Sequence, residues 1–431
     1  MRLCLHLLSV LFGDNRSLRF LCGNFGCRTF LFVGEIMANA KLSEAKNAKN
    51  DEFYTQYEDI QREINAYVEY NSDVFRGKTV LLPCDDPEWS NFTKFFAQNF
   101  ENFGLKKLIS TSYAYESKNQ NYGYQLTFYE MNSPQFDEDK TKTHGKIFTL
   151  TRDSNKSGVI DIDDLEWHYL EGDGDFRSDE VKALRDEADI IVTNPPFSLY
   201  RDFIDWIIEK EKKFIIIGNK NSVTYKEVFP LIMHNKMWSG KTGWGGGMWF
   251  ETQNPADVDK VVNGINMKNV SSVWFSNIEH GKRHEPLSLM TMADNLKFSK
   301  HNEIKEFGYR KYDNYDAIEV PYTDAIPIDY DGVMGVPISF LEKYCPEQFE
   351  ILGLLQSSTD EQAGIPNLRY YDDFKEMRQD MSFTGASGKK ANGNPVVQGK
   401  SEKGNFLYNE QTKEYVHSVY ARIVIKKRVQ E

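Results

Sequence analysis

One short segment that ends in two prolines, Ala188 to Phe197, constrains the fold of this chain more than any other stretch. Residues 190–193 are apolar or β-branched, which is typical of a fully buried parallel strand. The prolines that follow cannot donate hydrogen bonds to a strand ladder, so the strand has to end beside them. The segment therefore predicts that Asn194 and Phe197 emerge at the carboxyl end of a buried strand, where open α/β sheets bind their ligands.

The residue types at this strand end suit a planar amino group. The side-chain oxygen of Asn194 and the carbonyl of Pro195 can accept both hydrogens of one NH₂ group, and Phe197 offers an aromatic face for a flat ring. An Asp, Asn or Ser followed by Pro-Pro and an aromatic residue is the motif of amino-group methyltransferases that use S-adenosylmethionine. The predicted catalytic residues are Asn194, Pro195, Pro196 and Phe197. The alternative is a simple strand-ending turn, since Asn-Pro commonly opens turns.

The order of the predicted elements indicates the fold class. Strand patterns occur at residues 78–84, 105–112, 167–170, 188–193 and 213–218, and a helical pattern follows each of them except 105–112. This alternation predicts an α/β fold with a mostly parallel sheet and helices on both faces. Residues 114–158 have no clear period, and we expect them to form an insertion that carries a hairpin.

Composition limits the class of protein. The 431 residues are 40% hydrophobic and 14% aromatic, which is enough for one large domain or two moderate ones. A net charge of −12 argues against a surface that coats nucleic acid uniformly, so any DNA contact requires a local basic patch. Beyond the first 27 residues the cysteines are Cys84 and Cys345, a pattern typical of a reduced, cytoplasmic protein. Neither these cysteines nor the eight histidines show metal-ligand spacing, so we predict no metal.

The chain divides into three stretches. Residues 1–36 hold two short, interrupted apolar runs that make a poor signal peptide, and Met37 is the expected start. We therefore exclude 1–36 from the fold as a non-native leader, and nothing else in the sequence approaches a membrane span. Residues 37–300 carry the alternating strands and helices, whereas the periodicity of 301–431 is weak.

Two segments upstream of the proline motif are candidates for binding a cofactor. Phe53-Tyr54-Thr55 precedes a predicted helix start, where free N–H groups favour an anion such as a methionine carboxylate. A hydrophobic staple explains the same pattern equally well. Asp85-Asp86-Pro87 ends the first predicted strand, and its carboxylates can accept hydrogen bonds from an ammonium group or from ribose hydroxyls. A helix cap or a Mg²⁺ site is the alternative there.

A third candidate segment, Glu171 to Phe176, follows the strand predicted at 167–170. Its glycines allow a close approach of the backbone. Asp173 or Asp175 can accept a hydrogen bond from the adenine amino group of a cofactor, with Phe176 against the adenine ring. A calcium loop is the rival, but the twelve-residue spacing of its ligands is missing.

Two regions are candidates for DNA contact. Residues 385–428 hold nine Lys plus Arg against three Asp plus Glu, whereas residues 130–189 carry a net charge of −9 and should face away from phosphate. A solvated tail is the alternative for the basic region. The Gly-rich stretch 239–250 can wedge a tryptophan into a groove, or it can form a packed hairpin. The predicted DNA contacts are Lys389, Lys390, Lys400, Lys403 and Trp244.

Four motifs in this order resemble those of the EcoRI-type adenine-specific DNA methyltransferases. They are residues 51–56, residues 84–87 with 90–92, residues 193–198 and residues 221–228. The resemblance covers roughly residues 47–430. In that family an Asp-Asp-Pro strand tip replaces the glycine-rich turn that is usual in methyltransferases.

The resemblance implies a class I methyltransferase (Rossmann-like) fold with S-adenosylmethionine bound over the strand tips. Residues 37–300 would form the catalytic domain, and 301–431 an appended target-recognition region. The implied reaction is methylation of N6 on an adenine flipped out of double-stranded DNA. We expect the protein to act as a monomer, and two possibilities stay open: a cognate restriction endonuclease as partner, or an enzyme that acts alone. Three alternatives stay open: methylation of cytosine N4, methylation of a protein glutamine, and DNA binding without catalysis.

Overall fold

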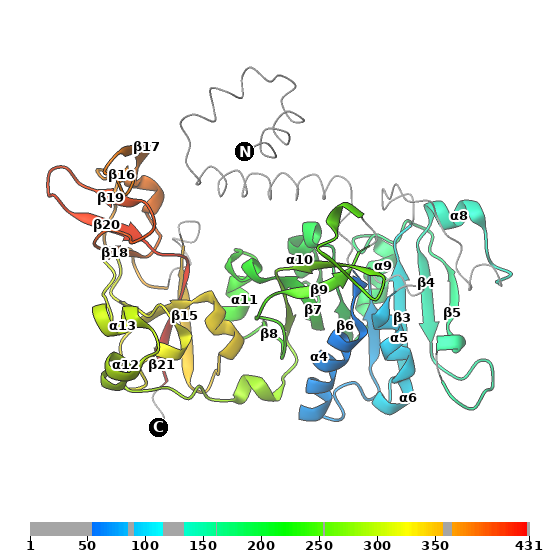
Figure 1. Ribbon diagram of the computed structural model, residues 1–431. Helices are drawn as coiled ribbons and strands as arrows, with labels where there is room; N and C mark the ends of the chain where they lie inside the picture. The colour runs from blue at the N-terminus through cyan, green and yellow to red at the C-terminus, as the bar shows by residue number, and fades with distance from the viewer. Residues whose placement is uncertain are drawn as a thin grey trace, which may run out of the picture.

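A computed structural model of the chain describes residues 54–84, 90–114, 133–160, 162–252, 255–356 and 364–428. Phe53 and the segment Asp85-Asp86-Pro87 lie outside the described residues. Figure 1 shows a large sheet flanked by helices and, beside it, a second part made of the C-terminal strands.

The large sheet has eight strands in the order β5-β4-β3-β2-β6-β7-β12-β8. They are β2 (Thr79–Leu82), β3 (Lys107–Ser112), β4 (Lys146–Leu150), β5 (Glu166–Tyr169), β6 (Ile190–Thr193), β7 (Lys213–Asn219), β8 (Trp238–Ser239) and β12 (Ser272–Ser276). The central strands β3, β2, β6 and β7 run parallel to one another. The outer strands pair antiparallel on both sides. The prediction of a mostly parallel sheet is therefore wrong for the outer strands, and the sheet is mixed.

Helices cover both faces of this sheet, because alternate residues of each buried strand point to opposite sides. One face holds α4 (Tyr57–Tyr70), α5 (Asn91–Gln98) and α6 (Phe100–Phe103), packed on residues such as Val80, Val192 and Ile215. The other holds α9 (Asp179–Glu187), α10 (Tyr200–Ile208) and α11 (Phe229–Met233), packed on residues such as Leu81, Ile191 and Ile216. The α/β class and the helices on both faces agree with the prediction.

A four-stranded sheet, here called the edge sheet, takes three of its strands from the chain between β8 and β12 and the fourth, β1, from the N-terminal segment. Its order is β1-β9-β11-β10, with β1 (Tyr54–Thr55), β9 (Met248–Glu251), β10 (Lys260–Val262) and β11 (Ile265–Val270). Strand β8 is antiparallel to β12 and so runs in the direction of β7, toward the carboxyl ends of the parallel strands. The edge sheet therefore leaves and rejoins the large sheet at the edge where ligands bind in α/β proteins.

The C-terminal part consists of two sheets with the helices α12 (Met292–Phe298) and α13 (Asn302–Phe307) beside them. The first sheet comprises β13 (Ile318–Glu319), β14 (Met334–Pro337), β21 (Arg422–Lys427) and β15 (Phe349–Leu355). The second comprises β17 (Phe383–Ser387), β16 (Lys375–Met377), β19 (Phe406–Tyr408), β20 (Tyr415–Ser418) and β18 (Val396–Gln398). Buried side chains of α11 and of the first sheet, including Ile232 and Ile423, share one hydrophobic cluster.

The remaining helix of the described residues is α8 (Glu138–Thr143), which lies in the predicted insertion. That insertion also supplies β4, which pairs antiparallel with both β3 and β5. None of the helices in the described ranges has the length and apolar character required to cross a bilayer.

A buried histidine joins α4 to the large sheet. His280 is 2% exposed, its ring packs edge-on against Tyr67 at 5.4 Å, and its Nε2 lies 2.9 Å from the carbonyl oxygen of Ser239. In this position the neutral ring donates from Nε2 to the carbonyl. Burial of the ring is the main reason that its pKa is lowered from 6.5 to about 4, with nearby cations adding to the effect.

We expect this histidine to make the folded state less stable as the pH falls from about 6.5 toward 4. In that window the unfolded chain binds a proton at position 280 and the folded chain does not, so stability rises with pH. The contribution amounts to about 2 kcal/mol between pH 7 and pH 5. Urea unfolding of the wild type and of His280→Gln at both pH values measures it. An equal pH dependence in the two proteins would contradict the assignment.

Candidate active site

The end of β6 is tied to the end of its neighbour β2. The hydroxyl of Thr193, the last residue of β6, donates a hydrogen bond to the carbonyl of Pro83, just beyond β2. Cys84 follows with φ 65°, a left-handed conformation that is uncommon for a residue other than glycine. Cys84 thus makes a tight turn directly after β2, and Asn194, which follows Thr193, lies beside this turn.

The proline motif emerges at the carboxyl end of β6, as the sequence predicted. Asn194 and Phe197 are half-buried, whereas Pro195 is buried, so the backbone at the motif is held firmly while its side chains border the surface. Phe197 opens a 3₁₀ turn that continues directly into α10. The Oδ1 atom of Asn194 is shielded from solvent in this conformation.

The edge sheet brings the N-terminal motif to the proline motif. The rings of Phe197 and Phe250 pack edge-on with their centroids 6.4 Å apart, and Phe250 is the register partner of Thr55. The side chain of Asn91 donates to the carbonyl of Thr55 over 2.8 Å. Asn91 is the first residue of α5, and the preceding Ser90 caps that helix by accepting from the amide of Phe92. Residues Tyr54–Thr55, the start of α5 at Asn91 and the proline motif therefore lie close together around the end of β6.

The loop with Asp173 and Asp175 lies at the carboxyl end of β3. The amide of Ala114 donates to the carbonyl of Asp173 over 2.8 Å. Gly174 has φ 84°, and a Cβ atom there would lie 2.2 Å from the carbonyl oxygen of Ser112, so only glycine fits. Since β2 alone separates β3 from β6 in the sheet, this loop and Asn194 belong to the same edge, about 10 Å apart across two strand spacings.

The two carboxylates of this loop differ in their partners. Asp175 is held by the guanidinium of Arg177, with Oδ2 2.6 Å from Nη2. The hydroxyl of Tyr113 lies 3.5 Å from the same carboxylate. Burial and the hydrogen-bonded Asp173 raise the pKa of Tyr113 above its usual value, so the phenol stays protonated. Tyr113 is not among the residues predicted from the sequence. The one signal for it is its place directly after the strand predicted at 105–112.

Phe176 does not have the position that the sequence suggested. It is 3% exposed and packs edge-on against Phe203 and Trp206, with ring centroids 5.1 and 5.7 Å away. A ring enclosed in this way belongs to the hydrophobic core and offers no face to an adenine. We therefore remove Phe176 from the candidate cofactor residues.

Trp244 also has a different role from the predicted one. Its side chain is 7% exposed, and its indole N–H donates to the hydroxyl of Ser239 over 3.1 Å. Its carbonyl accepts from the ammonium group of Lys220. The prediction that Trp244 wedges into DNA is wrong for this conformation, because the indole is packed inside the protein.

The four candidate lysines lie in the connections between strands of the second C-terminal sheet, and all four are exposed. Lys390 is paired with Glu376 at 2.6 Å. Lys400 lies over the ring of Tyr415, with its Nζ 4.5 Å from the ring centroid. Lys389 and Lys403 are the other two. Contact of these four lysines with phosphate stays a prediction.

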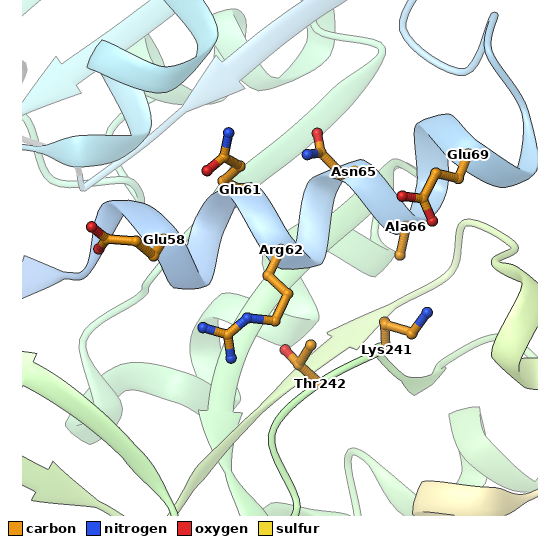
Figure 2. A pocket seen from close by; sticks show the side chains of 8 residues that line it. All are labelled: Glu58, Gln61, Arg62, Asn65, Ala66, Glu69, Lys241 and Thr242. Atoms are coloured by element: carbon orange, nitrogen blue, oxygen red, sulfur yellow. The ribbon is translucent and has the colours of Figure 1, made fainter.

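A shallow cavity of about 460 Å³ lies between α4 and the loop after β8, apart from the predicted site. Figure 2 shows Arg62 of the helix reaching toward Thr242 of the loop. Hydrogen bonds join the two elements. The buried Glu63 of α4 accepts from the amides of Lys241 and Thr242 in the loop over 2.7 and 2.8 Å. The lining residues are Glu58, Gln61, Arg62, Asn65, Ala66, Glu69, Lys241 and Thr242. None of them belongs to the motifs above, so we assign this cavity no catalytic role.

Comparison with known proteins identifies the family. The profile of the adenine-specific methyltransferase EcoRI family matches residues 41–428. The chain belongs to this family. It is therefore an adenine-specific methyltransferase, and the resemblance seen in the four motifs is confirmed. Within the described residues, no group of three or more His, Cys, Asp or Glu side chains could hold a metal ion.

Three relatives in this methyltransferase family cover most of the chain. The Type II methyltransferase M.EcoRI of Escherichia coli is 42% identical over 73% of this chain and 89% of its own length. The Type II methyltransferase M.MgeORF184P of Mycoplasma genitalium is 34% identical over 73% of this chain and 86% of its own. The Type II methyltransferase M.MpnI of Mycoplasma pneumoniae is 34% identical over 73% and 85%, respectively. No solved structure matches the chain.

Proposed function

We propose that this protein is a site-specific DNA methyltransferase that acts on N6 of an adenine flipped out of duplex DNA, with S-adenosylmethionine as the methyl donor. The observation that carries the proposal is the placement of Asn194, Pro195 and Phe197 at the carboxyl end of β6, beside the end of β2. The same edge holds the loop of Asp173. The residues of the proposed amino-group clamp and the polar loop thus lie at one edge of the sheet, which supports a shared site.

The proposed fold is that of a class I methyltransferase, which is Rossmann-like. Its support is the run of four parallel strands β3-β2-β6-β7 followed by the antiparallel β12. In such a sheet a ligand belongs over the strand tips at the carboxyl edge, where the order of the strands changes direction beside β2.

The residues at this edge fit the chemistry of the cofactor. S-adenosylmethionine supplies a methyl group on a positively charged sulfur. The carboxylate of Asp173 and the protonated phenol of Tyr113 can bind hydroxyl and amino groups of its nucleoside half. The carboxylate of Asp175 lies 3.5 Å from the Tyr113 hydroxyl and helps to hold the phenol in position. On the side of β1, Tyr54 and Thr55, with the predicted Phe53, Asp85, Asp86 and Pro87, would hold the amino acid half.

The protein's contribution to the reaction is to position and polarise the target amino group. The lone pair of that nitrogen is delocalised into the purine ring, which makes it a weak nucleophile. Acceptors at the Asn194 side chain and the Pro195 carbonyl would draw its hydrogens out of the ring plane. They would also bind more strongly as positive charge develops on nitrogen, and this difference in binding lowers the barrier.

Phe197 would retain the extruded base by stacking, while Pro196 fixes the backbone that carries the Phe197 ring. Stacking on an aromatic side chain is worth about 1–3 kcal/mol, against a few kcal/mol lost on unstacking. The ring alone therefore does not drive extrusion. Contacts to the duplex and bending of the DNA have to supply the rest.

We assign the catalytic domain to residues 37–300 and the target-recognition region to 301–431. The exposed lysines Lys389, Lys390, Lys400 and Lys403 would contact phosphates there. The Type II designation of the three relatives supports a cognate restriction endonuclease as partner. Action as a monomer in the cytoplasm is part of the proposal and rests on the sequence pattern.

A methyl-transfer assay tests the function directly. The wild-type protein is incubated with radiolabelled S-adenosylmethionine and duplex DNA, the product is digested to nucleosides, and the methylated positions are mapped by sequencing. We expect all label in N6-methyladenine at one recurring site. Label in N4-methylcytosine, or in protein instead of DNA, would overturn the proposal. Duplex DNA already methylated at that site serves as the control and should accept no label.

A further inference from the structure

The hairpin of β10 and β11 exposes three apolar side chains at its end. Val261, Val262 and Ile265 are 60%, 42% and 41% exposed. Asn263 and Gly264 form the two-residue turn, with φ of 51° and 83°. Positive φ at both positions is the signature of a type I′ turn, which holds a hairpin in one shape. Val262 and its register partner Ile265 share one face of the hairpin, whereas Val261 points to the other face. The three side chains therefore form a preset tip that is apolar on both faces.

This tip is connected to the proline motif through two strand pairings and one ring contact. Strand β10 pairs with β11, β11 pairs with β9, and Phe250 of β9 packs on Phe197. In the register, Lys268 of β11 faces Phe250. With strands about 4.8 Å apart and about 3.3 Å per residue, Val262 lies about 10 Å across and about 10 Å along from Phe250. Ten ångströms is the length of about three base-pair steps in DNA.

The charges on the hairpin are compatible with a polyanion. The carboxylate of Asp259 is bound by the ammonium group of Lys268 at 3.2 Å and by the amide of Asn269 at 2.9 Å. Lys260 stands next to the apolar residues, with its Nζ 3.6 Å from the centroid of the Trp249 ring. The carboxylate of Asp259 at the base of the tip is thus neutralised, and the ammonium group of Lys260 flanks the apolar side chains.

The reaction creates a matching surface on the DNA. When an adenine leaves the duplex, the sugar and the faces of the adjoining bases are left open to water. Proteins that distort DNA place apolar side chains against such surfaces. If the three exposed side chains pack against the sugar and the base faces, the apolar surface of the protein and that of the DNA are both removed from water.

We infer that the tip formed by Val261, Val262 and Ile265 packs against the DNA beside the extruded adenine and stabilises the extruded state. This inference rests on the proposed function and adds to it a surface outside the four motifs. Its occupant is the DNA duplex. Pairing of the open edge of β10 with a second copy of the chain is the competing use of the same surface.

The test compares a triple serine variant, Val261→Ser with Val262→Ser and Ile265→Ser, with two controls. The first, Val261→Ile with Val262→Ile and Ile265→Val, keeps the tip apolar and β-branched. The second is Val159→Ser. Val159 is 55% exposed and lies between the end of β4 and the start of β5, at the opposite edge of the large sheet. It therefore measures the effect of removing an exposed valine away from DNA.

We expect the serine variant to raise the KM for DNA about tenfold or more, and both controls to stay within about twofold of the wild type. A 2-aminopurine in place of the target adenine, at the site mapped by sequencing, should fluoresce less with the serine variant. Binding of S-adenosylmethionine by calorimetry should be unchanged in all four proteins, which shows that the fold is intact.

Wild-type KM and wild-type 2-aminopurine fluorescence in the serine variant would overturn the inference. So would a change in oligomeric state by sedimentation with unchanged DNA kinetics, because the tip would then be a self-association surface. If the wild-type protein transfers no methyl group to DNA, the proposed function fails and this inference fails with it. That outcome is distinct from a failure confined to the variant.

Discussion

Asn194→Ala is expected to lower kcat for methyl transfer by about 10²- to 10³-fold, the cost of removing one side-chain contact that strengthens in the transition state. The substitution deletes the side-chain acceptor but keeps the carbonyl of Pro195. Asn194 is half-buried at the end of β6, so we expect the free energy of unfolding to change by less than about 1 kcal/mol. Single-turnover methyl transfer with DNA and cofactor at saturation measures the chemical step, and urea unfolding measures stability.

Asn194→Asp is the matched variant, because it retains an acceptor oxygen of the same shape and the motif itself allows Asp at this position. It should recover a large part of the activity that Asn194→Ala loses. Binding of S-adenosylmethionine should be equal in the two variants. A fully active Asn194→Ala protein would remove the amino-group clamp from the mechanism.

The central strands could be predicted because each is a short apolar run between polar segments, and such runs are typical of strands buried on both faces. Their directions could not. The strand predicted at 167–170 forms as β5, yet it pairs antiparallel with β4 at the outer edge of the sheet. Four or five residues carry no information on direction, because direction depends on where the connecting chain returns. The long insertion after β3 brings β4 and β5 back on the same side.

The position of the proline motif could be predicted for a related reason. Two prolines end a strand whatever surrounds them, so the neighbours of Asn194 depend mainly on which strands lie beside β6. The roles of the aromatic residues could not be predicted in this way. Phe176 and Trp244 are as apolar as Phe197, but they are 3% and 7% exposed. A sequence shows that a ring is large and apolar without showing whether it lines a site or fills the core.

A second substitution with a large expected effect concerns a buried ion pair in the first C-terminal sheet. Arg422 opens β21 and binds Glu319 of β13, with Nη2 2.6 Å from Oε1 and Nε 3.1 Å from both oxygens. The side chains are 11% and 4% exposed. Tyr312 donates its hydroxyl to the same carboxylate. Strand β14 lies between β13 and β21, so these contacts connect the two strands that flank it.

Glu319→Ala should lower the free energy of unfolding by about 3–5 kcal/mol, because it leaves a buried guanidinium without its carboxylate. Glu319→Leu combined with Arg422→Met removes both charges and should recover most of that loss. Denaturant unfolding of the three proteins gives the comparison. A loss below about 1 kcal/mol in Glu319→Ala would mean that water reaches Arg422 and that the pair is not effectively buried.

The same measurement tests how the two parts of the chain are coupled. Buried residues of α11 and of β15 and β21 belong to one hydrophobic cluster, which crosses the boundary proposed near residue 300. Because this core is continuous, we expect Glu319→Ala to shift one cooperative transition, seen alike by tryptophan fluorescence and by loss of S-adenosylmethionine binding. If cofactor binding instead survived a first transition, residues 301–431 would unfold independently of the sheet that carries Asn194.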